Sequence, residues 1–298
     1  MPPTLTLDVV LHARDTDASR RSYLRWPIVD VWRDQGHRVH IVQGPDVPHD
    51  ADVVVPHMDL TTMPAAYTQA LDAHPRVLNR AVRDLSKRVV SRNLVGRDAS
   101  WEGPVIVKTD ANHGGLPDHR LLTPDAGKPR SWRRRRTMRS EHYPVFASLH
   151  DVPRSVFGNP ALVVERFLPE REGELHAVRS YVRCAGHETC SRKLAREPSV
   201  KSRHVVAREA VPVAAEARAF ADDMGLDYGK VDYVVHQGEV VVLDVSATPT
   251  GAVGPLPFVA RQVALARAEA ALALFRRWLA AGPEPLAGKA CPPAPPAS

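Results

Sequence analysis

The fold is decided by the stretch GLDYGKVDYVVHQGEVVVLDVSATPTG, residues 225–251. Two valine-rich runs flank a Gln-Gly turn, and this pattern predicts a β-hairpin. Each run carries an aspartate, Asp232 and Asp244, although acidic residues are depleted in strands. A three-residue loop over 237–239 would place the two carboxylates opposite each other on one face, whereas a two-residue loop would place them on opposite faces. We expect the first arrangement.

The two aspartates are predicted metal ligands. Like charges at this separation repel each other, and a shared divalent cation removes the repulsion. Mg²⁺ takes oxygen ligands and commonly binds through one or two carboxylates together with substrate phosphates. Ser246 lies two residues after Asp244, on the same face, and adds a hydroxyl. The alternative interpretation is structural: one aspartate forms a salt bridge and the other lies at a strand edge.

Lysines near a glycine pair are the predicted phosphate ligands. Lys108 ends the apolar run VIVK shortly before Gly114 and Gly115, whose amides can approach phosphate oxygens closely. Lys87 lies on a helix predicted over 84–95. Neither GxxxxGK followed by Ser or Thr nor GxGxxG occurs in the chain, which excludes the common phosphate-loop and dinucleotide fingerprints. For each lysine, a place on the solvated surface is the alternative interpretation.

The remaining segments indicate a mixed α/β protein. Apolar runs at 5–13, 37–44 and 51–58, with a helical segment between the first two, predict a small parallel α/β unit at the N-terminus. Downstream, the pattern predicts further strands and helices: strands at 159–170 and 175–186, and helices at 209–225 and 258–282.

This order of features resembles the ATP-grasp superfamily. A lysine on a helix is followed by a strand-end lysine with a glycine loop, then by VVERFLPE, by arginines in strands and by the two-aspartate hairpin. The resemblance covers residues 84–260. It implies a small parallel α/β (pre-ATP-grasp) domain, 1–80, followed by an ATP-grasp domain, 81–282, of two subdomains. The ATP clamp would span about 84–170 and the metal-site subdomain about 171–282.

The resemblance also implies which residues bind ATP. Two lysines would contact the phosphates, the glycine loop would close over them, a hinge would bind adenine and an acidic residue would hold the ribose. These residues are Lys87, Lys108, Asn112, Gly114, Gly115, Glu165, Arg166, Phe167, Leu168, and Glu172 or Glu174.

The implied function is that of an ADP-forming, Mg²⁺-dependent ligase. Such an enzyme activates a carboxylate as an acyl phosphate and passes the acyl group to an amine or another nucleophile. Arg179 and Arg192 would stabilise the transferring phosphoryl group, and we add Lys201 because of its position. Its partners would be a small-molecule or peptide carboxylate and a nucleophilic acceptor, and a homodimer is compatible with the sequence.

The metal end departs from the family pattern. The superfamily's usual ending resembles Glu-x-Asn, whereas this chain has Asp244, Val245 and Ser246. Asp is shorter than Glu, and a serine hydroxyl is a weaker ligand than an Asn carbonyl. A nucleotide-binding regulatory or scaffold protein without ligase turnover is therefore the alternative function.

Charge leaves a third alternative, a phosphate- or nucleic-acid-binding module. The 298-residue chain has a formal charge of +6, with 40 basic and 34 acidic side chains. Six of the arginines fall in residues 130–140, and removing them leaves 34 against 34. The excess is thus one patch around Arg133–Arg136, which is more typical of a solvated loop than of a nucleic-acid footprint.

Composition predicts a cytoplasmic protein. The three cysteines, Cys184, Cys190 and Cys291, show no metal or disulfide spacing, which is typical of a reducing compartment. We expect no signal peptide, because the N-terminus lacks a basic leader, and no membrane span, because no apolar run is long enough. The proline-rich tail, 283–298, is predicted to be disordered.

Overall fold

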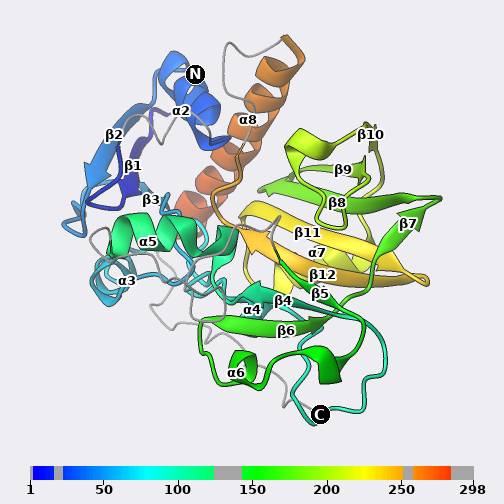
Figure 1. Ribbon diagram of the computed structural model, residues 1–298. Helices are drawn as coiled ribbons and strands as arrows, with labels where there is room; N and C mark the ends of the chain where they lie inside the picture. The colour runs from blue at the N-terminus through cyan, green and yellow to red at the C-terminus, as the bar shows by residue number, and fades with distance from the viewer. Residues whose placement is uncertain (1–2, 17–22, 124–142, 251–257, 283–298) are drawn as a thin grey trace.

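The computed structural model describes residues 3–16, 23–123, 143–250 and 258–282 (Figure 1). The described chain forms one parallel and two antiparallel β-sheets with helices packed around them, so the predicted mixed α/β class is confirmed. The Arg133–Arg136 run, Cys291 and the proline-rich tail lie outside the described residues. Among the helices that are described, none has the length and apolarity required to cross a membrane.

The N-terminal unit is the predicted small parallel sheet. Its strands lie in the order β2-β1-β3, and helix α2 leads from β1 to β2. Val and Leu side chains bury β1 and β3 on both sides, as expected of parallel strands, whereas the edge strand β2 stays partly exposed. The elements are β1 (Thr6–Leu11), α2 (Arg25–Asp34), β2 (Arg38–Gln43), β3 (Val53–Pro56) and α3 (Ala65–Asp72).

The long C-terminal helix, α8 (Phe258–Ala281), packs on this N-terminal unit (Figure 1). The indole N–H of Trp32, a fully buried residue of α2, donates a 3.2 Å hydrogen bond to the carbonyl of Ala268. Phe275 and Tyr228 belong to the same hydrophobic cluster. Helix α8 therefore contributes side chains to the hydrophobic core of the N-terminal unit. The domain boundaries at residues 80 and 282 stay a prediction.

A second, three-stranded antiparallel sheet carries the glycine loop. The strand order is β5-β4-β6. The elements of this region are α4 (Lys87–Val90), β4 (Val105–Thr109), η1 (Asn112–Gly115), α5 (Leu116–Leu122), β5 (Val145–Phe146), η4 (Leu149–Asp151), α6 (Arg154–Phe157) and β6 (Leu162–Arg166).

The helix predicted over 84–95 is wrong in length, because only the single turn α4 forms. The two β-branched residues that end this turn, Val89 and Val90, have low helix propensity. Beyond them, the Ser91 hydroxyl accepts a 3.1 Å hydrogen bond from the backbone N–H of Asn93, and this local bond competes with the helix. The chain then continues to Leu94, which forms an isolated antiparallel β-bridge with Glu165 of β6.

The third sheet is antiparallel, with the strand order β10-β9-β8-β11-β12, and β7 pairs with β8. Helix α7 packs against β11 and β12, on a cluster that includes Val231 and Val245. The elements are β7 (Glu170–Glu172), β8 (Leu175–Cys184), β9 (His187–Ala195), η5 (Ser202–His204), β10 (Ala207–Ala210), α7 (Ala215–Asp223), β11 (Tyr228–His236) and β12 (Glu239–Ser246).

The hairpin of β11 and β12 places Asp232 directly opposite Asp244, as predicted. The predicted three-residue loop is wrong: His236 pairs with Glu239, so the turn has two residues, and both have positive φ. The register then shifts between Asp232 and Tyr233 through a β-bulge that leaves Leu243 without a partner. This one extra residue in β12 returns Asp244 to a position opposite Asp232.

Candidate functional site

A pocket of about 270 Å³ lies between the second and third sheets. It is lined by residues of β4, β8, β9, β11 and β12, and by the loop 198–202. Its apolar lining includes Ile106, Phe167, Leu168, Ala177, Val178, Val200, Val234 and Leu243. A cleft that brings apolar side chains together with convergent polar groups is the usual form of a small-molecule site.

Lysines dominate the charged lining. The chain has seven lysines and 33 arginines, and all five lysines of the described residues line this one pocket. We call it the lysine pocket; its lysines are Lys87, Lys108, Lys193, Lys201 and Lys230. One arginine, Arg166, lines it as well. The ammonium group is a compact point charge that suits phosphate oxygens, whereas arginine serves the ion pairs elsewhere in the chain.

The acidic side chains that line the lysine pocket are Asp232 and Asp244. Leu243 lines it too, although neighbouring residues of a strand normally face opposite sides. The bulge at Leu243 explains the exception, because a bulge places two residues of one strand against a single residue of its partner. One irregularity thus positions an apolar and an acidic side chain together.

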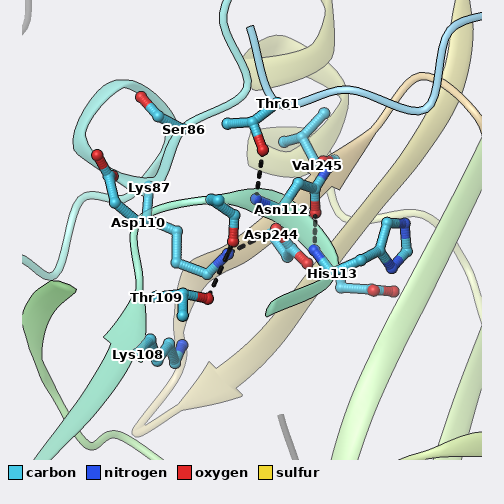
Figure 2. A network of polar contacts seen from close by, with 12 residues as sticks. Thr61, Ser86, Lys87, Lys108, Thr109, Asp110, Asn112, His113, Asp244 and Val245 are labelled. Atoms are coloured by element: carbon cyan, nitrogen blue, oxygen red, sulfur yellow. Dashed lines mark hydrogen bonds and ion pairs between the residues drawn. The ribbon is translucent and has the colours of Figure 1, made fainter. Parts of the chain in front are cut away.

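Asp244 forms an ion pair with Lys87, whose Nζ lies 3.3 Å from Oδ1 (Figure 2). Burial raises the pKa of Asp244, but the charges of Lys87 and His113 outweigh it and lower the pKa overall. Burial lowers the pKa of Lys87, yet Asp244 raises it further, so the net shift is upward. Both groups are therefore charged at neutral pH.

Asp232 is held more tightly. Lys230 donates to Oδ2, and the Ser180 hydroxyl donates to Oδ1 at 2.6 Å. Lys193 in turn donates to the Ser180 hydroxyl at 2.8 Å. Burial raises the pKa of Asp232, but Lys230 and Lys193 lower it more strongly, to about 2. Neither Lys193 nor Lys230 was predicted as a site residue.

Lys108 is fixed by a buried ion pair with Glu165, 2.6 Å from Nζ to Oε2. Glu165 is fully buried and does not line the lysine pocket. In the predicted adenine hinge, the amides of Arg166 and Phe167 already donate to carbonyls of the chain. The amide of Leu168, which lines the pocket, has no partner within the described part of the chain and stays free for a ligand.

The glycine loop is anchored on both sides (Figure 2). The backbone N–H of Asn112 donates to the Thr61 hydroxyl at 2.7 Å, and its side-chain amide donates to the Val245 carbonyl at 2.7 Å. Asn112 is buried and holds the loop rather than lining the pocket, whereas His113 and Gly114 line it. Gly114 has a φ of 72°, and the next residue, Gly115, repeats this left-handed conformation.

The predicted residues that do not line the lysine pocket also include Gly115, Arg179, Arg192, Glu172 and Glu174. Arg179 and Arg192 bind Glu170, at 3.0 Å and 2.7 Å. Glu172 pairs with Arg192 on the same side, and Glu174 is exposed. Strand alternation explains the result for the arginines, because their direct neighbours, among them Lys193, point into the pocket instead. The ribose-binding role of Glu172 or Glu174 stays a prediction.

Ser246 also lies away from the pocket lining. It is buried, and its hydroxyl accepts a 3.2 Å hydrogen bond from the backbone N–H of Thr248. Across the described ranges, no three His, Cys, Asp or Glu side chains come together as a self-sufficient metal site. The opposed carboxylates of Asp232 and Asp244 offer the oxygen ligands that Mg²⁺ takes, but too few to hold the ion alone, so a phosphate ligand would have to complete its coordination.

The fold was compared with known proteins. No protein-family model matches the sequence, and no curated protein matches it. Among solved structures, the ATP-grasp ligase PsnB, in complex with a minimal precursor, Mg and ADP, superposes with a TM-score of 0.52 at 14% identity, over 90% of this chain and 97% of that one. An ATP-grasp RimK domain protein from Sphaerobacter thermophilus gives 0.47 at 14% identity, over 89% and 99%. The small parallel sheet, the sheet that carries the glycine loop and the two-aspartate hairpin follow one another along the chain, and the chain has the ATP-grasp fold.

Proposed function

We propose that this protein is an ATP-dependent ligase that activates a carboxylate and joins it to an amine or another nucleophile. The observation that supports this function best is the lysine pocket, where five ammonium groups and two aspartates adjoin an apolar lining. The apolar side chains suit a flat base, and the ammonium groups suit a triphosphate. The proposed ligand is therefore ATP with Mg²⁺.

The chemistry would proceed in two steps. A carboxylate oxygen of the substrate attacks the γ-phosphorus, the bond to the β-phosphate oxygen breaks, and ADP leaves. The acceptor then attacks the acyl carbon, loses a proton, and inorganic phosphate leaves. Lys87, Lys108 and Lys201 would neutralise the charge on the phosphate oxygens throughout. Mg²⁺, when bound, would shield the same oxygens beside the Asp232 and Asp244 carboxylates.

Nucleotide binding is the first test. MgATP at millimolar concentration should raise the melting temperature, because a ligand of the native state stabilises it by mass action, and GTP should do so less. Lys108→Met should abolish the shift, while Arg208→Met, an exposed change on β10, should preserve it. No shift with folded wild-type protein would refute nucleotide binding. ADP release, screened over pairs of carboxylates and amines, then tests turnover.

Nucleotide binding without turnover is the second candidate function. The observation in its favour is Ser246, which stands where the family has Asn and whose hydroxyl is engaged by the Thr248 amide. This candidate predicts a full MgATP thermal shift with no ADP release across the whole substrate screen. ADP release that depends on both a carboxylate and an acceptor would exclude it.

A further inference from the structure

The two aspartates of the hairpin differ in how their oxygens are engaged. Both oxygens of Asp232 already have partners, Lys230 on Oδ2 and the Ser180 hydroxyl on Oδ1. Asp244 has one partner, Lys87, at the longer distance of 3.3 Å, and its side chain is 29% exposed. Opposed carboxylates therefore have unequal capacity for a metal ion.

Two ammonium groups converge on Asp232. Lys230 contacts it directly, and Lys193 reaches it through the Ser180 hydroxyl, which accepts from Lys193 at 2.8 Å and donates to Asp232. Their combined charge equals that of one divalent cation. Both lysines also line the pocket, so their remaining N–H groups can reach a phosphate oxygen.

A second divalent ion at Asp232 would lie beside both ammonium groups. Its charge would repel them at hydrogen-bond distances, where Coulomb energies in a partly buried site are large. Ser246 offers no compensating oxygen, because it is buried and bonded to the Thr248 amide. Asp244 meets a single lysine and keeps one oxygen without a partner in the described segments, which leaves room for one ion.

We propose that the nucleotide binds with one divalent ion, held on the protein side by Asp244, while Lys230 and Lys193 supply the second positive centre at Asp232. The proposal rests on the proposed function only in assuming that the pocket binds a nucleotide. Ser180 is then a positioning residue, since it couples the Lys193 ammonium to the Asp232 carboxylate.

The test counts bound Mn²⁺ by electron paramagnetic resonance, with ADP or a non-hydrolysable ATP analogue at saturation. Wild-type protein should bind one Mn²⁺ per chain, and the double variant Lys193→Met/Lys230→Met should bind two, because Asp232 is released. Arg208→Met is the matched control and should remain at one. A count of two in the wild type, or of one in the double variant, would overturn the proposal.

A second pair of variants keeps the test decisive if the double variant does not fold. Asp244→Asn should weaken Mn²⁺ binding about tenfold or more, as expected for the loss of a ligand. Asp232→Asn should keep one Mn²⁺ with an affinity within about threefold of wild type. Equal losses in both variants would contradict the proposal. If equilibrium dialysis shows no bound ADP at all, the proposed function fails instead, and the two failures are thereby distinguished.

Discussion

Asn112 and Val245 are joined by a 2.7 Å hydrogen bond from the side-chain amide of the first to the carbonyl of the second. The bond links the glycine loop after β4 to the strand residue that follows Asp244, across 133 positions of sequence. It is buried, so neither group can turn to water for a substitute. The bond therefore helps to fix the relative position of the glycine loop and the aspartate hairpin.

Asn112→Asp is expected to break this link. The change keeps the shape of the side chain but sets a carboxylate oxygen against a carbonyl oxygen. Leaving both groups unsatisfied should cost about 1–3 kcal/mol of unfolding free energy. MgATP affinity should fall as well, because the loop loses its anchor on β12. Chemical denaturation and calorimetric titration measure the two effects, and an unchanged ATP affinity would show that the loop position does not matter for binding.

Neighbouring residues of β12 should respond in opposite ways to truncation. Val242 belongs to the hydrophobic cluster under α7, so Val242→Ala should lower the free energy of unfolding by about 2 kcal/mol. Leu243 is bulged into the lysine pocket, so Leu243→Ala should weaken ATP binding with little loss of stability. Denaturation and titration of both variants provide the comparison. Equal effects of the two changes on ATP affinity would argue against a base-binding role for Leu243.

Glu170 should act on stability rather than on nucleotide binding. Burial raises the pKa of Glu170, but hydrogen bonds from Arg179, Val235 and Arg192 lower it by more, so the net shift of the pKa is downward. A depressed pKa means that Glu170 stabilises the fold above the unfolded-state value of about 4.5 and that this contribution is lost as pH falls through the lower folded-state pKa.

Glu170→Gln should therefore destabilise the protein at pH 7 by about 3 kcal/mol, since it removes the carboxylate that pairs with Arg179 and leaves Arg192 with only its exposed partners Glu172 and Glu209. It should also flatten the loss of stability between about pH 5 and pH 3. Thermal unfolding across that range gives both results, and Glu174→Gln, an exposed change nearby, is the control. An altered ATP affinity in folded Glu170→Gln would indicate that Arg179 and Arg192 take part in nucleotide binding.

Lys201 should make ATP binding sensitive to alkaline pH. Burial lowers its pKa below the ordinary value, although Asp244 and Asp232 partly offset this. As pH rises through this lowered value, Lys201 loses its charge and attracts phosphate less strongly. ATP affinity should thus fall at a pH below the ordinary lysine pKa of about 10.4, and less so in Lys201→Met, which should already bind more weakly at pH 7. Titration calorimetry in buffers of different ionisation enthalpy would also detect the linked proton uptake.

The sequence predicts the apolar parts of this fold better than the polar parts. The buried parallel strands and the valine-rich hairpin carry periodic patterns, and they appear within a few residues of the expected positions. Strand β9, with the sequence HETCSRKLA, carries no such alternation. Arg192 and Lys193 are neighbours in this strand and therefore point to opposite faces of the sheet. Only the register with β8 decides that Lys193, and not Arg192, faces the pocket.

The bulge at Leu243 could not be predicted either. Turn chemistry favours the two-residue Gln-Gly loop that forms, and the hairpin pattern alone gives no sign of the later register shift. The missed lysines, in contrast, did carry a signal. The chain uses arginine almost five times as often as lysine, so a lysine indicates a position that favours a compact ammonium group over a planar guanidinium. Lys230 also stands two residues before Asp232.

The gathering of the lysines changes how the protein should react with chemicals. Reagents that acylate amines normally scatter over a protein surface, but the described lysine side chains of this chain all line one pocket. On the described residues such a reagent would behave as a site-directed label, and a bound ligand would shield five of the seven lysines of the chain at once. Because lysine is scarce in this chain, amine reactivity distinguishes the pocket from the rest of the described surface.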